Sequence, residues 1–183
     1  KNKVVGMAGI LDTSRFKYFL SQELNVSVKK IKSLVLGGHG DTMVSMLNHT
    51  SVDGKPVLDL VKEGTLDKNS LEKIVNRTKS GGAEIVKLLE RGSAFYAPAA
   101  SGVEMAESYL KDLKKQLPCA AYLDGEYGIE NLYAGVPVII SGKGVEKIIE
   151  LTLSPEEKKD FNNSIAAVQD LFSAAKKIDP TLC

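Results

Sequence analysis

The sequence contains no tryptophan and, among its 183 residues, only two cysteines and two histidines. Cys119 and Cys183 are too few and too far apart in the chain to predict a disulfide framework or a zinc site. No cluster of histidine, cysteine and aspartate has the spacing of metal ligands, so we expect no bound metal. Cys119, in the apolar run LPCAAYL, is expected to be a small buried hydrophobe. The low cysteine content favours a reducing, cytoplasmic environment.

An excess of charge of one sign is also lacking. The chain has 24 basic and 23 acidic residues, a formal net charge of +1. This balance gives no electrostatic reason to expect nucleic acid or an anionic membrane as a partner. No apolar run approaches the roughly 20 residues that a membrane span requires, and we expect no secretory leader. Binding to nucleic acid or to a membrane is therefore not expected.

What the chain does contain is the composition of an ordinary globular domain, with 43% hydrophobic and 26% charged residues. We find no internal repeat, low-complexity tract or linker, so residues 1–183 are expected to form one domain. The first residue is Lys1, not methionine. We therefore expect the chain to be processed or to be a piece of something longer.

Helical periodicity recurs in several segments. After Asp12, apolar residues follow one another at helical spacing, so a helix is expected to begin there with Asp12 as its cap. A helix is also expected over 67–92, interrupted at Gly81–Gly82 by a kink or a close backbone contact. A further helix is expected from Pro98 to near residue 117. The last one begins at Ser154, with the Ser-Pro-Glu-Glu pattern of a capping box.

Strand signals lie between these helices. The segment IKSLVLGGHG predicts a strand that runs into a glycine-rich turn, and three later strands are expected over 118–124, 135–141 and 145–152. The dipeptide DG at 53–54 and the segment SGKG at 141–144 predict hairpin turns. Because helices and strands are grouped rather than regularly alternating, the pattern indicates an α+β fold.

The two histidines differ in their surroundings. His49 lies in SMLNHTSV and is expected to be a surface or packing residue. His39 is flanked by Gly37, Gly38 and Gly40, which permit unusual dihedrals and close approach of other groups. Such a histidine suits proton transfer near neutral pH, but a sharp turn that happens to include a histidine fits the pattern equally well. Asp41 is expected to be a turn residue.

Asp12 and Arg15 are three residues apart, so they should project from the same side of a helix. If the helix begins at Asp12, Arg15 lies in the first turn, where the helix dipole disfavours a cation. An anionic ligand would resolve this misfit, because a guanidinium offers a bidentate match to a carboxylate. The alternatives are a solvated arginine or an ordinary ion pair with Asp12.

The segments GMAGILDTSRF (6–16) and LGGHGDTMV (36–44) together resemble the lactate/malate dehydrogenase superfamily. The segments RGSAFYAPAAS (91–101) and AAYLDGEYGIENLYAGVPVIISGKGVEKIIEL (120–151) are similar to its lactate-dehydrogenase-like bacterial malate dehydrogenases. The resemblance extends over essentially the whole chain. It implies the C-terminal, substrate-binding domain of that family, with mixed helices and antiparallel sheets. The family's N-terminal Rossmann domain is expected to be absent, since no G-x-G-x-x-G occurs here.

The resemblance also implies roles for individual residues. His39 corresponds to the family's proton donor and acceptor, and Asp12 to the aspartate that orients it. Arg15 corresponds to the arginine that binds the substrate carboxylate. Ala94 and Pro98 correspond to positions that line the substrate and nicotinamide pocket, Ala94 toward substrate and Pro98 toward cofactor. The implied reaction is the NAD-dependent interconversion of malate and oxaloacetate, in a homodimer or homotetramer, with the isolated domain inactive.

Two other functions stay open from the sequence. One is lactate dehydrogenase, because the family's specificity loop is not in this chain. The other is a non-catalytic module for oligomerisation or carboxylate binding.

Overall fold

The computed structural model describes residues 1–182, and Cys183 lies outside the described residues. The α-helices are α1 (Ala8–Leu24), α2 (Val57–Lys62), α3 (Lys68–Leu89), α4 (Tyr96–Leu110) and α5 (Pro155–Ile178). The strands are β1 (Ile31–Lys32), β2 (Val35–Gly37), β3 (Met43–Ser45), β4 (Ser51–Val52), β5 (Lys55–Pro56), β6 (Lys115–Asp124), β7 (Glu130–Ser141) and β8 (Gly144–Ile148). Short 3₁₀ turns connect them, among them η2 (Gly40–Thr42) and η3 (Leu47–His49).

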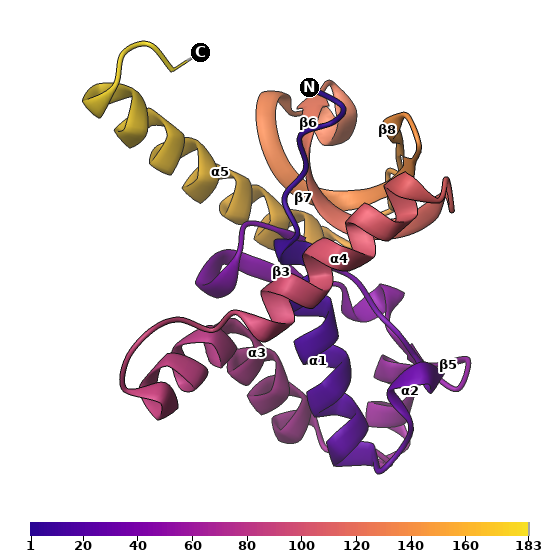
Figure 1. The fold of residues 1–183 in the computed structure, drawn as a ribbon. Helices are drawn as coiled ribbons and strands as arrows, with labels where there is room; N and C mark the ends of the chain where they lie inside the picture. The colour runs from indigo at the N-terminus through magenta and orange to yellow at the C-terminus, as the bar shows by residue number, and fades with distance from the viewer. Residues whose placement is uncertain (183) are drawn as a thin grey trace.

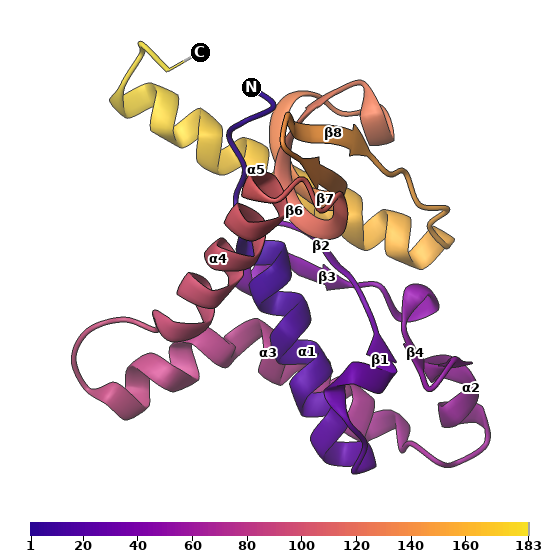
Figure 2. The same ribbon diagram turned by 45° about the vertical axis from the view of Figure 1, so that its right-hand side comes forward.

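The strands form antiparallel sheets. One has the order β1-β4-β5, and the other has the order β3-β2-β7-β6 with β8 paired to β7. Figures 1 and 2 show α1 and α3 side by side in one half of the molecule and the curved β6–β7 sheet in the other. The expected α+β fold with antiparallel sheets is confirmed.

Two predicted hairpin turns and the predicted cap of α5 are confirmed. The hairpin at 53–54 joins β4 to β5, and the hairpin at 141–144 joins β7 to β8. Ser154 accepts a hydrogen bond from the Glu157 amide, and the Glu157 side chain completes the capping box. These signals depend only on neighbouring residues, which is why the sequence predicts them well.

The end of α4 differs from the prediction. The helix begins at Tyr96 with Pro98 in its first turn, but it ends at Leu110 rather than near residue 117. Asp112 and Lys114 adopt left-handed backbone conformations, with φ of 49° and 53°. This turn starts β6 at residue 115, so that three residues expected to be helical pair instead with β7.

Helix α1 joins the two apolar clusters of the core. Ile10 belongs to the cluster built on β6 and β7, whereas Phe16 and Leu20 belong to the cluster between α1, α2 and α3. Both of the latter side chains are fully buried. Because one helix is packed into both clusters, side chains that project from its middle are held firmly in place.

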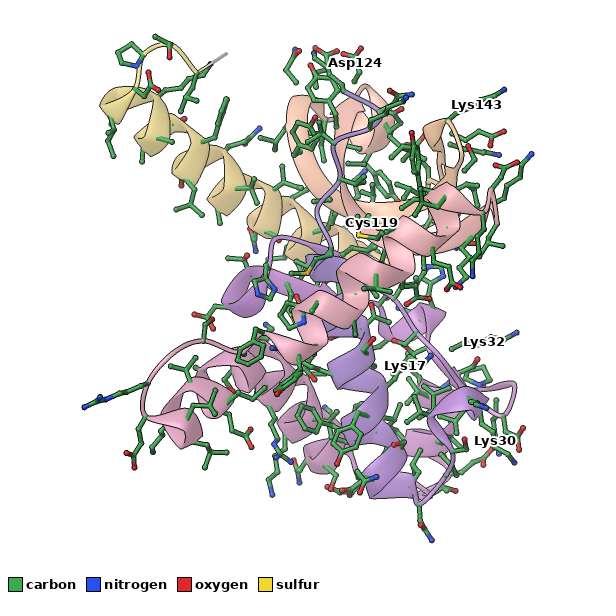
Figure 3. The ribbon with its side chains drawn as sticks, viewed as in Figure 1. Lys17, Lys30, Lys32, Cys119, Asp124 and Lys143 are labelled. Atoms are coloured by element: carbon green, nitrogen blue, oxygen red, sulfur yellow. The ribbon has the colours of Figure 1, made fainter. Side chains whose placement is uncertain are left out.

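Cys119 lies in β6 near the middle of the molecule (Figure 3). Its side chain is fully buried, which confirms that it is an interior hydrophobe. Burial, with a smaller contribution from the charge of Glu104, raises the pKa of its thiol to about 12. Among residues 1–182, no helix is both long and apolar enough to cross a bilayer.

Candidate active site

Asp12 lies inside α1 and is not its cap, so the predicted helix start is wrong. The helix begins at Ala8, with Met7 at the capping position, which places Asp12 more than one turn into the helix. Gly9 permits this earlier start, because a Cβ at that position would collide with the Pro118 backbone. Arg15 is therefore beyond the first turn, and the expected conflict with the helix dipole does not arise. The carboxyl group of Asp12 is almost completely buried, with 1% of its surface exposed.

His39 follows β2 in a tight, glycine-rich loop. Gly37 and Gly40 adopt φ values of +83° and +67°, a region that side chains other than glycine rarely enter. A Cβ at Gly37 would collide with Ser164 of α5, and a Cβ at Gly38 would collide with Thr42. The glycines are therefore required for the loop to pass this close to its neighbours.

The loop brings His39 onto Asp12. The Nδ1 atom of His39 lies 2.8 Å from Oδ2 of Asp12, so the imidazole N–H donates a hydrogen bond to a buried carboxylate. The His39 side chain itself is 52% exposed. The pKa of His39 is raised, chiefly by the hydrogen bond to Asp12 and further by the negative charge of Asp12. Burial of the ring and the positive charge of Arg15 act in the opposite direction and lower the pKa. With Nδ1 engaged, Nε2 is the nitrogen that can exchange a proton with another molecule.

Arg15 lies beside this pair with few polar contacts. Its Nη1 atom is 3.6 Å from Oδ1 of Asp12, and its side chain is only 11% exposed. No hydrogen-bond partner reaches that Oδ1 atom among the residues that the structure describes. The guanidinium therefore keeps most of its donors for a further anion close to the histidine.

Glycines on α3 make room for Arg15. A Cβ at Gly81 would lie 3.1 Å from Arg15 Cδ, and a Cβ at Gly82 would lie 3.6 Å from Nη1. The sequence predicts a kink or a close backbone contact at this glycine pair, and the structure instead places the Arg15 side chain against it. α3 runs through both glycines as one helix.

Ala94 lies in the connection between α3 and α4, and Pro98 lies in the first turn of α4. Both residues are half-buried. Helix α4 packs across α1, the helix that carries Asp12 and Arg15 (Figure 1). The assignment of Ala94 and Pro98 to a substrate and nicotinamide pocket stays a prediction.

Other candidate residues lie apart from this cluster. The Nε2 atom of His49 is 3.0 Å from the Thr152 carbonyl oxygen, a packing contact of the kind expected. Asp41 is exposed in η2. Within residues 1–182, no group of three or more histidine, cysteine, aspartate or glutamate side chains could hold a metal ion. Ser164 hydrogen-bonds the His39 loop from 126 residues away, and no local sequence signal points to it.

The chain is similar to known proteins over almost its whole length. The family profile described as lactate/malate dehydrogenase, alpha/beta C-terminal domain matches residues 10–178. A malate dehydrogenase of Pelagibacter ubique (strain HTCC1062) is 67% identical over 181 residues, which are 99% of this chain and 57% of that protein. The chain therefore spans little more than half the length of this relative.

Solved structures of both enzyme types have the same fold. A malate dehydrogenase of Cryptosporidium parvum superposes with a TM-score of 0.93 at 43% identity, over 96% of this chain and 56% of that one. A lactate dehydrogenase of Eimeria maxima with NADH and oxamate superposes with a TM-score of 0.94 at 42% identity, over 100% of this chain and 57% of that one.

Proposed function

Because the chain belongs to the lactate/malate dehydrogenase family, through that family's α/β C-terminal domain, we propose that it supplies the proton-transfer and carboxylate-binding groups of an NAD-dependent malate dehydrogenase. The observation that carries the proposal is the contact of His39 with the buried Asp12, beside the under-partnered Arg15. A proton carrier and a carboxylate binder next to each other suit a 2-hydroxy acid. The 67% identity to a malate dehydrogenase favours malate and oxaloacetate as the substrate pair.

In this mechanism Arg15 binds a carboxylate of malate through two parallel hydrogen bonds, which orients the hydroxyl-bearing carbon. Nε2 of His39 accepts the hydroxyl proton as that carbon loses its hydride and becomes a carbonyl. Asp12 stabilises the imidazolium that forms and keeps Nδ1 protonated throughout. In the reverse direction, protonated His39 returns the proton to the oxaloacetate carbonyl oxygen.

NAD, when bound, supplies the hydride acceptor of this reaction. The residues described here do not fit a dinucleotide pocket, because their strands pair antiparallel and no parallel βαβ unit is formed. Pro98 is the one contact with the cofactor that we propose in this chain. We accordingly propose that residues 1–183 alone do not oxidise malate.

A chimera tests the proposal directly. Residues 1–183 replace the aligned residues of the Pelagibacter ubique malate dehydrogenase, and malate-dependent reduction of NAD is followed by absorbance. We expect His39→Asn to lower turnover by about 10² to 10⁴, the usual contribution of a general acid–base. His49→Asn, which changes the other histidine, is the matched control and should keep the parent rate. Near-parental turnover in the His39→Asn chimera would contradict the proposal.

The same chimera separates malate from lactate chemistry and tests Arg15. Oxaloacetate should be reduced faster than pyruvate, and an equal or faster rate with pyruvate would favour lactate dehydrogenase. Arg15→Lys keeps the charge but loses the bidentate geometry, so we expect a higher KM for malate. An unchanged KM would remove Arg15 from the substrate site.

We also propose that the chain forms a homodimer or homotetramer. Tyr96, Val103 and Leu110 recur every seven residues along α4 and are 83%, 66% and 78% exposed. A stripe of this spacing lies on one side of a helix and is typical of a buried contact. Light scattering of the chain tests this, and a monodisperse monomer at high concentration would contradict it.

A further inference from the structure

The loop that carries His39 is attached to α5 through one buried hydroxyl group. We propose that Ser164 is a positioning residue for His39, because it holds from α5 the amide of Gly38, the residue before the imidazole. The inference rests on the proposed function only for the role that it gives to His39. Its physical content, the position of the ring, can be measured without turnover.

The contact is short, and its acceptor belongs to a buried side chain. The Gly38 amide donates to Ser164 Oγ over 2.7 Å, and Ser164 is 3% exposed. On the other side of His39 in the chain, Thr42 Oγ1 donates to the His39 carbonyl oxygen over 3.4 Å, a longer and weaker contact. Ser164 is therefore the stronger of the two restraints on the backbone beside the ring.

Ser164 lies in the part of α5 that is itself most firmly held. Phe161 and Ile165, on either side of it, are buried in the core cluster of β6 and β7. The helix start is fixed by the capping box of Ser154 and Glu157. Glu157 also accepts a hydrogen bond of 3.1 Å from the Asn48 amide in η3. The hydroxyl of Ser164 is thus a fixed reference point for the loop.

The loop needs such a restraint because of its composition. Glycine has the widest range of accessible dihedrals, and three of the four residues from Gly37 to Gly40 are glycine. Asp12, by contrast, is buried in a packed helix. A shift of the loop would therefore lengthen the 2.8 Å contact between Nδ1 of His39 and Asp12 by moving the ring alone.

The titration of His39 reports this contact. Asp12 and Arg15 of α1 act on the ring, while Asp41 of η2, Lys79 of α3 and Asp160 of α5 line the pocket next to Ser164. Asp12 raises the pKa of His39 through the hydrogen bond. Loosening the loop should weaken that bond and lower the pKa toward its ordinary value of about 6.5.

The experiment compares Ser164→Ala with Ser108→Ala in the 183-residue chain. Ser108 is also a fully buried helix serine whose hydroxyl makes two hydrogen bonds, to Ile140 and Lys115, at a site remote from His39. Ser108→Ala removes two hydrogen bonds and Ser164→Ala removes one, so the control is the larger local loss. Only Ser164→Ala should lower the titration midpoint of the His39 ring proton in NMR, with His49→Asn identifying the signal. The Gly38 amide should also exchange with solvent about tenfold faster in that variant.

An unchanged His39 midpoint in folded Ser164→Ala, or an equal change in Ser108→Ala, would overturn the proposal. If Ser164→Ala does not fold, Ser164→Cys keeps the size with a weaker acceptor and should give a smaller shift of the same sign. A shifted midpoint together with an active His39→Asn chimera would contradict the proposed function and leave the positioning role standing. An inactive His39→Asn chimera with no shift in Ser164→Ala would support the proposed function and contradict the positioning role of Ser164.

Discussion

The packing of Arg15 on α3 makes a sharp prediction for Gly81→Ala. The new Cβ would lie 3.1 Å from Arg15 Cδ, several tenths of an ångström closer than an ordinary contact. Arg15 is 11% exposed and stands against Asp12, so it has little room to withdraw. Overpacking of this kind costs about 1–3 kcal/mol. Replacing a helical glycine by alanine contributes about 1 kcal/mol of stability in the other direction.

Gly82→Ala is the matched control, because it is the neighbouring residue in the same helix. Its Cβ would lie 3.6 Å and 3.7 Å from the Arg15 guanidinium nitrogens, ordinary van der Waals distances. Gly82→Ala should therefore show only the helical gain of about 1 kcal/mol. The free energy of unfolding of Gly81→Ala should be lower than that of Gly82→Ala by about 1–3 kcal/mol.

Urea unfolding of the two variants and the parent chain measures this difference, with equal slopes confirming that the unfolded states are comparable. Thermal unfolding should show the same order, at about 2–4 °C for each kcal/mol in a chain of this size. If Gly81→Ala is stabilised as much as Gly82→Ala, Arg15 does not pack on α3. The account of how Arg15 is placed beside His39 would then be wrong.

Two further predictions concern single ionisable groups. The hydrogen bond to Asp12 raises the folded-state pKa of His39. The bond therefore stabilises the fold fully below about pH 6.5, the unfolded-state pKa, and this stabilisation is lost as the pH rises through the folded-state pKa. The difference in free energy of unfolding between the parent and His39→Gln, from urea titrations at several pH values, should decline along that range; a constant difference would refute the linkage. Burial raises the pKa of the Cys119 thiol to about 12, so in a Cys183→Ser chain it should not react with a disulfide reagent at pH 8 until urea unfolds the protein. Reaction in the folded state would show that β6 opens locally.

Resemblance and local pattern together anticipated a large part of the site. Asp12, His39 and Arg15 were expected from the two motifs, and their geometry places the three side chains next to one another. The glycines around His39 were recognised, but the reason for each was not visible. Gly37 and Gly38 are required by Ser164 and Thr42, and Ser164 comes from a helix near the other end of the chain.

The start of α1 illustrates where local reasoning fails. Asp12 is a good capping residue, and nothing in its neighbours prevents a helix from beginning there. The helix nevertheless begins at Ala8, and Gly9 lets its first turn lie against the Pro118 backbone in β6. An aspartate that would otherwise face water at a helix end is instead buried and held against an imidazole.

By itself the sequence determined the turns, the capped start of α5, the α+β pattern and the residue types available for chemistry, because these depend on near neighbours and on backbone preferences. The tertiary structure decided which side chains meet. Asp12 lies 27 residues from His39, and Ser164 lies 126 residues from Gly38. Contacts over such separations form only when the core clusters bring α1, β2 and α5 together, since no local interaction holds the segments close.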